Sequence, residues 1–173
     1  SVGALLARDW RWLVSFLAAQ YVGVFILTLQ HLPLGMATVK VIAGWMGTAI
    51  LGMTRSNLDE ADDAGILPQG RFFRLVAAGI VALVAAASAP AVDIMMADTG
   101  TAVAAGSLLL IGMGLLHLGV TDQPRRVTVG LMTVLAGFEV LYAAVENSVL
   151  VAALLAVINL GLALVGAYLM TAS

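Results

Sequence analysis

Six runs of predominantly apolar residues, each roughly 20 residues long, limit the folds open to this chain. A helix of that length crosses the hydrocarbon core of a bilayer, and charged or turn-forming residues bound every run. The sequence therefore predicts an all-α polytopic membrane protein with six transmembrane helices. We expect them from about Trp10 to Gln30, Leu34 to Met53, Phe72 to about Ile94, about Thr101 to Val120, Val127 to Val145, and about Val149 to Met170.

Composition supports the membrane assignment and excludes several other classes of protein. Hydrophobic residues make up 62% of the chain, charged residues 10%, and the mean hydropathy is +1.06, which no soluble domain of this size shows. Because there is no cysteine, disulfides, thiolate metal sites and a cysteine nucleophile are excluded. The net charge of -2 argues against nucleic acid as a partner, so the expected surroundings are the lipid bilayer and other membrane proteins.

The connections divide the chain into two three-helix segments of one membrane domain, at 1–95 and 96–173. The longest connection runs from Thr54 to Gly70 and holds an acidic cluster, Asp59, Glu60, Asp62 and Asp63. We interpret this cluster as a solvated loop, with acidic docking to a partner as the alternative. Since the chain begins at Ser1 and not at a methionine, we expect it to be processed or incomplete at its start.

The basic residues predict the orientation of the helices. Seven of the eight Lys and Arg residues lie around the start of the first run, or within or beside the connections that follow the second and fourth runs: Arg8, Arg11, Arg55, Arg71, Arg74, Arg125 and Arg126. Basic connections stay on the cytoplasmic side of a membrane, so both termini are expected in the cytoplasm. Trp10 and Trp12 fit an interfacial aromatic anchor at the same side.

Glu139 interrupts the fifth run near the middle of the stretch from Thr128 to Asn147. A carboxylate at that depth is costly unless it is paired, hydrated or neutral, and such residues commonly belong to ion pathways. Glu139 is therefore our first candidate for a proton path.

Lys40, the eighth basic residue, lies inside the second run, at roughly 9 Å from its outer end. A lysine at that depth either extends its ammonium to the membrane surface or faces the bundle and pairs with a carboxylate. The small residues around it favour the paired, protein-facing position; they are Gly35, Ala37, Ala43, Gly44 and Gly47.

Asn159 is the third candidate and lies close to the middle of the sixth run. It either bridges two helices by hydrogen bonds or sits beside Glu139 and holds a water in a proton path. The short connection Glu146-Asn147-Ser148 makes the last two helices a hairpin, which places the two residues at comparable heights.

Neither histidine indicates a cofactor site. His31 falls at the outer end of the first helix and His117 near the inner end of the fourth, so they cannot clamp one haem. His117 is a weak candidate ligand for a chlorophyll-type pigment, since Gly112, Gly114 and Gly119 leave room beside it; the alternative is an interfacial histidine hydrogen-bonded to a neighbouring helix. The chain has no phosphate-binding glycine loop, metalloprotease motif or nucleophile elbow, so we expect no cofactor, no metal and no catalytic centre in it.

The second half of the chain, 108–145 and then 151–169, resembles the K-type small subunit of respiratory complex I and its MrpC relative in multisubunit cation/proton antiporters. The shared features are a glycine-rich helix, a basic turn, a G-x-E element and a final G-L-A-L pattern, here at Arg125-Arg126, Gly137 to Glu139 and Gly161 to Leu164. With six helices and an early lysine at Lys40, the whole chain also resembles component E of hydrogenase-4 and formate hydrogenlyase complexes.

The resemblance implies that Glu139 belongs to a chain of buried ionisable residues in the inner membrane of a prokaryote. A second glutamate of that family falls near Asn159, which cannot carry a proton by itself. The expected function is that of a membrane subunit of a complex I-like or antiporter-like assembly, such as a proton-translocating oxidoreductase, whose partners are larger membrane subunits. Two alternatives stay open: a structural or pigment-organising subunit of a respiratory or photosynthetic complex, and a free-standing proton-coupled transporter.

Overall fold

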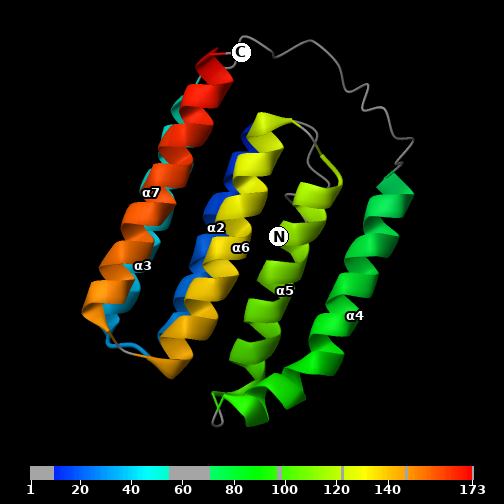
Figure 1. Cartoon of the computed structure of the whole chain (residues 1–173), viewed down its shortest axis with the longest axis vertical. Coiled ribbons are helices and arrows are strands. Elements are labelled where there is room, and N and C mark those ends of the chain that lie inside the picture. The colour runs from blue at the N-terminus through cyan, green and yellow to red at the C-terminus, as the bar shows by residue number, and fades with distance from the viewer. Residues whose placement is uncertain (1–9, 55–70, 97–98, 122, 147, 173) are drawn as a thin grey trace.

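The computed structural model describes residues 10–54, 71–96, 99–121, 123–146 and 148–172, and these residues form helices without any strand (Figure 1). The six helices are α2 (Trp10–Thr28), α3 (Leu34–Met53), α4 (Arg71–Met95), α5 (Thr101–Gly119), α6 (Pro124–Val145) and α7 (Val149–Ala172). Each contains a segment long and apolar enough to cross a membrane. The chain is therefore an all-helical integral membrane protein, as its sequence predicts.

Helix boundaries differ from the expected ones by a few residues, and α6 differs most. It begins at Pro124 instead of Val127, because proline at the first helical position lacks only an N–H that has no partner within the helix. This earlier start moves Glu139 away from the middle of its helix. Glu139 lies six residues, or about 9 Å, from Val145 at the other end of α6.

The helices run alternately up and down, so the bundle has two distinct ends (Figure 1). Three short connections join the helices at one end, which we call the hairpin end: 29–33, 96–100 and 146–148. The other end, which we call the basic end, carries Arg11, Arg74 and Arg126 near the ends of α2, α4 and α6. These three arginines lie at the same end of the bundle, as the positions of the basic residues in the sequence predict. Arg8, Arg55 and the acidic cluster at 59–63 lie outside the described residues.

Four helices form a closed ring in which α2 packs on α3, α3 on α7, α7 on α6, and α6 on α2. The helices that face each other across this ring, α2 with α7 and α3 with α6, bring no Cα atoms of the described residues within 8 Å. Helix α5 packs against α6 and, less extensively, α2, and within the described residues α4 packs only on α5. Figure 1 shows α7, α6, α5 and α4 side by side, with α3 and α2 behind the first two.

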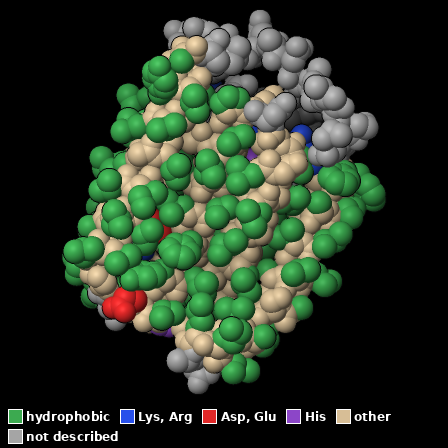
Figure 2. Space-filling view, in the orientation of Figure 1, with side chains coloured by type: hydrophobic (Ala, Val, Ile, Leu, Met, Phe, Trp, Pro, Cys, Tyr) green, Lys and Arg blue, Asp and Glu red, His purple; other side chains and the backbone are tan. Residues whose placement is uncertain are grey.

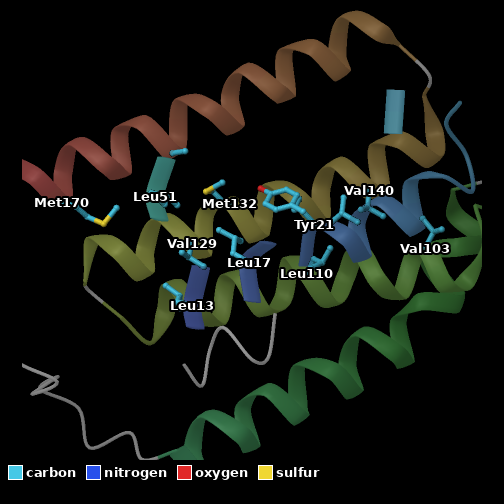
Figure 3. Packing of buried hydrophobic residues seen from close by; sticks show 13 residues of the cluster. Leu13, Leu17, Tyr21, Leu51, Val103, Leu110, Val129, Met132, Val140 and Met170 are labelled. Carbon is cyan, nitrogen blue, oxygen red and sulfur yellow. The ribbon is translucent and has the colours of Figure 1, made fainter. Parts of the chain in front are cut away.

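Buried residues recur every three or four positions along each helix of the ring, which is the period of a helix face turned towards other helices. On α2 they include Leu13, Leu17, Tyr21 and Val24, and on α6 Val129, Met132, Ala136 and Val140. These side chains meet in one apolar cluster with residues of α3, α5 and α7 (Figure 3). The outer faces of the helices are also apolar, and Figure 2 shows hydrophobic side chains over most of the visible surface. An apolar exterior is what a lipid environment requires.

Glycines allow α5 and α6 to approach closely. A Cβ atom added at Gly137 would lie 2.8 Å from the backbone nitrogen of Ile111 and 2.8 Å from the carbonyl oxygen of Ser107. One added at Gly114 would lie 2.7 Å from the backbone nitrogen of Val134. Small residues at such contacts are the usual means of packing helices in a membrane.

Helix α4 is the peripheral helix of the bundle. Pro90 lies inside it and removes one backbone hydrogen bond, and the helix bends near its hairpin end (Figure 1). Its buried residues are the small side chains Ala78, Ala85 and Ala89, on the side that faces α5. Only 17% of its membrane-crossing segment is buried, so most of α4 is available to lipid or to another protein.

Candidate functional site

Lys40 and Glu139 face each other inside the four-helix ring. Lys40 lies six residues from the hairpin end of α3, and Glu139 lies six residues from the hairpin end of α6, so both are about 9 Å from that end. The Lys40 Nζ atom is 3.8 Å from the Glu139 Oε2 atom. The protein-facing, paired position expected for Lys40 is therefore confirmed.

Both members of this ion pair are withdrawn from the surface of the bundle. Their side chains are 4% and 3% exposed. At 3.8 Å the pair is held by charge attraction without a direct hydrogen bond, and the Lys40 ammonium has no hydrogen-bond partner among the described residues. An unpaired charge in such surroundings is costly, so each of the two residues stabilises the charged form of the other.

Tyr21 and Asn159 make the second polar connection across the ring. The Tyr21 hydroxyl of α2 donates a hydrogen bond to the Asn159 Oδ1 atom of α7 at 3.1 Å, and both side chains are fully buried. Figure 3 shows the Tyr21 ring among the apolar side chains of the core. Asn159 lies ten residues, or about 15 Å, from the hairpin end of α7, roughly one helical turn deeper than Glu139.

The two polar connections belong to one site. Tyr21 interacts electrostatically with Glu139 as well as bonding to Asn159. Lys40–Glu139 joins α3 to α6, and Tyr21–Asn159 joins α2 to α7, so each spans one of the two pairs of helices that face each other across the ring. Asn159 thus bridges two helices, and Tyr21 is the residue that connects it to the ion pair. Together these four side chains form a polar centre inside an apolar bundle, and we refer to them as the polar centre.

Gly44 makes room for Tyr21. A Cβ atom at this position of α3 would overlap the Tyr21 ring, so the aromatic side chain can lie flat against the α3 backbone only because Gly44 has none. Lys40 precedes Gly44 by one helical turn on the same face of α3. The glycine that the sequence analysis assigned to helix packing near Lys40 therefore also positions the tyrosine of the polar centre.

A third buried polar contact lies nearer the basic end. The Gln20 Nε2 atom of α2 donates a hydrogen bond to the Thr133 Oγ1 atom of α6 at 3.3 Å, and both residues are buried. Thr133 in turn donates to the Val129 carbonyl oxygen at 2.8 Å. The Gln20 Oε1 atom has no hydrogen-bond partner among the described residues, so this amide retains an unused acceptor.

Tyr21, Gln20 and Thr133 are not among the residues expected from the sequence. Gln20-Tyr21 is a polar-aromatic pair inside an otherwise apolar run and carries a signal comparable to that of Asn159. Thr133 gives no such signal, because threonine in a membrane helix commonly bonds to a carbonyl oxygen one turn earlier, as it also does here.

The two histidines lie at opposite ends of the bundle, as expected, so they do not share a ligand. His31 lies at the hairpin end, whereas His117 lies two residues from the basic end of α5. His117 is 5% exposed, and its Nε2 atom has no hydrogen-bond partner among the described residues. That His117 binds a pigment stays a prediction. No cluster of three or more His, Asp or Glu side chains suited to a metal ion occurs within the parts of the chain that the structure describes.

Comparisons of this chain with protein-family models, with curated proteins and with solved structures find no match. The candidate site is thus defined by its own geometry: an ion pair and a tyrosine–asparagine bond that cross the centre of a four-helix ring.

Proposed function

We propose that this chain is an integral membrane subunit of a complex I-like or antiporter-like assembly, in which Glu139 is a protonatable site of a proton path. The observation that carries the proposal is the buried Lys40–Glu139 pair, 3.8 Å apart and inside the bundle. Buried, paired ionisable residues are rare in membrane helices and are commonly found in proton relays and ion pathways.

The polar centre contains the groups that a proton relay needs. Glu139 takes up and releases the proton. When Glu139 is neutral, the Lys40 charge loses its partner in an apolar interior, which favours the loss of a proton from Lys40 or the renewed ionisation of Glu139. The two residues thus form a coupled pair in which a change of charge at one alters the other.

The remaining polar contacts extend the proposed proton path from the ion pair towards the basic end. Tyr21 interacts electrostatically with Glu139 and donates a hydrogen bond to Asn159, and Gln20 and Thr133 lie nearer the basic end. Hydroxyl and amide groups both donate and accept hydrogen bonds, so they can order water between ionisable sites. In the proposed path, Asn159 acts as a hydrogen-bonding group, because its amide does not ionise.

The arrangement of the helices favours a subunit over a free-standing transporter built from an inverted repeat. Such a repeat would match α2–α4 with α5–α7, and equivalent helices would make equivalent contacts. Helices α6 and α7 pack together, whereas their counterparts α3 and α4 do not touch within the described residues. The large apolar surface of α4 suits a subunit that packs beside larger membrane proteins.

Substitution of Glu139 by Gln tests the proposal directly. The variant should be introduced into the native host, and two quantities compared with the unmodified protein: the amount of assembled complex on a native gel, and the rate at which membrane vesicles build a proton gradient. We expect the variant complex to assemble in spite of a loss of stability, and the rate per assembled complex to fall at least tenfold, as expected for the removal of a proton-transfer group.

Glu146→Gln is the matched control, because Glu146 is exposed at the end of α6 and undergoes the same chemical change. Unchanged proton transport in the Glu139 variant would contradict the proposed proton path and would leave the ion pair with a structural role alone. Mass spectrometry of the intact complex extracted in mild detergent should find larger antiporter-like subunits with this chain. Migration alone or as a small homo-oligomer would contradict the proposed assembly.

A further inference from the structure

Three polar side chains lie on neighbouring helix ends at the basic end, on the opposite half of the bundle from the polar centre. Arg74 lies in the first turn of α4, His117 in the last turn of α5, and Arg126 in the first turn of α6. Because α4 packs on α5 and α5 on α6, these helix ends are adjacent. The His117 ring interacts electrostatically with both arginines. The group therefore combines two positive charges and one imidazole.

Two of these side chains hold buried nitrogen atoms that lack hydrogen-bond partners. The Nε2 atom of His117 and the Nε atom of Arg74 are both buried, and neither has a partner among the described residues. The Arg126 Nε atom donates to the Gln123 Oε1 atom at 3.3 Å, so Arg126 is already oriented by a neighbour. Leaving a buried polar group without a partner is costly, and an anion that accepts from these nitrogens would remove that cost.

The surroundings indicate which kind of anion fits. All three residues lie within about one helical turn of a helix end, which is the depth of the lipid headgroups. Apolar side chains on the same turns of α4 are exposed beside Arg74: Phe72, Phe73, Leu75 and Val76. A lipid has its phosphate and its acyl chains in this relative position, and basic pockets between membrane helices are known to hold phosphate headgroups. Guanidinium groups match phosphate oxygens in geometry and charge.

We propose that Arg74, His117 and Arg126 form a site for a phosphate group, supplied by an anionic phospholipid, between the basic ends of α4, α5 and α6. Arg74 and Arg126 provide the charge, and the His117 ring provides a hydrogen bond from within the helix interface. The lipid attaches the peripheral helix α4 to α5 and α6 at an end of the bundle where α5 is its only helical neighbour within the described residues. This site is independent of the proton path proposed above.

Thermal unfolding of the purified full chain in detergent tests the proposal. The melting temperature is measured against rising concentrations of phosphatidylglycerol, phosphatidylcholine or inorganic phosphate. We expect saturable stabilisation by phosphatidylglycerol and little by phosphatidylcholine. Arg74→Gln should weaken the apparent affinity for phosphatidylglycerol about tenfold, as expected for the loss of a charge-assisted contact.

Arg11→Gln is the matched control, since Arg11 is exposed at the same end of the bundle but on α2. It should bind phosphatidylglycerol with unchanged affinity. His117→Leu provides a second readout: removal of a buried nitrogen without a partner should leave the lipid-free protein at least as stable, while the stabilisation by phosphatidylglycerol decreases.

The results separate the sources of phosphate. Equal, Arg74-dependent stabilisation by inorganic phosphate would support the phosphate site but assign it to a soluble ion. Equal stabilisation by both lipids, equal weakening in the Arg11 and Arg74 variants, or no stabilisation by any of the three compounds would overturn the proposal.

Discussion

Lys40 and Glu139 form an ion pair between α3 and α6, two helices whose Cα atoms stay more than 8 Å apart throughout the described residues. Their long side chains reach across the interior of the ring, whereas every neighbouring pair of helices in the ring is joined by direct packing. The ion pair therefore ties opposite sides of the ring, and its loss should affect stability as well as proton transfer.

Removal of both partners should destabilise the protein by less than the sum of the two single removals. Glu139→Gln or Lys40→Met leaves a buried group without its partner, which costs about 3–5 kcal/mol for a buried ion pair. The double variant should cost less than the sum by about 2 kcal/mol, a coupling typical of residues in contact. Unfolding in a denaturing detergent measures the four free energies, with Glu146→Gln as the exposed control. Strictly additive losses would show that the two charges do not interact.

The Tyr21–Asn159 bond should contribute a smaller amount. Tyr21→Phe keeps the ring against Gly44 and removes only the hydroxyl, so we expect a loss of about 1 kcal/mol from the unpaired Asn159 oxygen. Tyr168→Phe, at an exposed tyrosine of α7, is the control and should have almost no effect. If Tyr21 also belongs to the proton path, its variant should slow proton transport in vesicles while the complex stays assembled.

Close packing of α5 on α6 predicts that Gly137 does not tolerate a methyl group. In Gly137→Ala, the new carbon atom would meet backbone atoms of Ile111 and Ser107, which cannot rotate away. The helices must then separate, and overpacking of this kind costs about 1–3 kcal/mol. Gly161→Ala on α7 meets nothing within 4 Å and should be neutral or slightly stabilising, because alanine favours helix. Equal melting temperatures for the two variants would contradict the observed contact.

The absence of cysteine from the sequence makes orientation easy to measure. A single cysteine at Ala172, exposed near the basic end, should react with a membrane-impermeant maleimide only when the reagent reaches the cytoplasm. One at Glu146, exposed at the hairpin end, should react from outside the cell. The expectation follows from the arginines at the basic end. The opposite labelling pattern would place the termini outside.

The sequence predicted the fold closely, because the bilayer fixes the length of each helix and leaves few alternatives to six spans. The bounds of α3 matched the expected ones, Leu34 and Met53, where Pro33 and Thr54 flank an unbroken apolar run. The start of α6 differed because Pro124 reads as a turn former in sequence but is well suited to the first position of a helix.

Part of the polar centre was also predictable, since Glu139, Lys40 and Asn159 stand out against apolar neighbours. Their grouping was harder to predict, because it depends on which helices become neighbours, and almost every face of these helices is apolar. Tyr21 shows the difficulty: a tyrosine reads as an ordinary core or interfacial residue until its hydroxyl is seen to meet Asn159. The roles of these residues in proton transfer stay predictions.

Pairing α3 with α6 also imposes an order on synthesis in the cell. Lys40 emerges from the ribosome about 100 residues before Glu139, which corresponds to roughly 5–20 s at the usual rate of translation. During that interval the lysine must enter or wait beside the membrane without its carboxylate. The first helical hairpin therefore enters the membrane before its buried lysine has a partner. Insertion of the last two helices completes the ion pair and stabilises the first two helices in the bilayer.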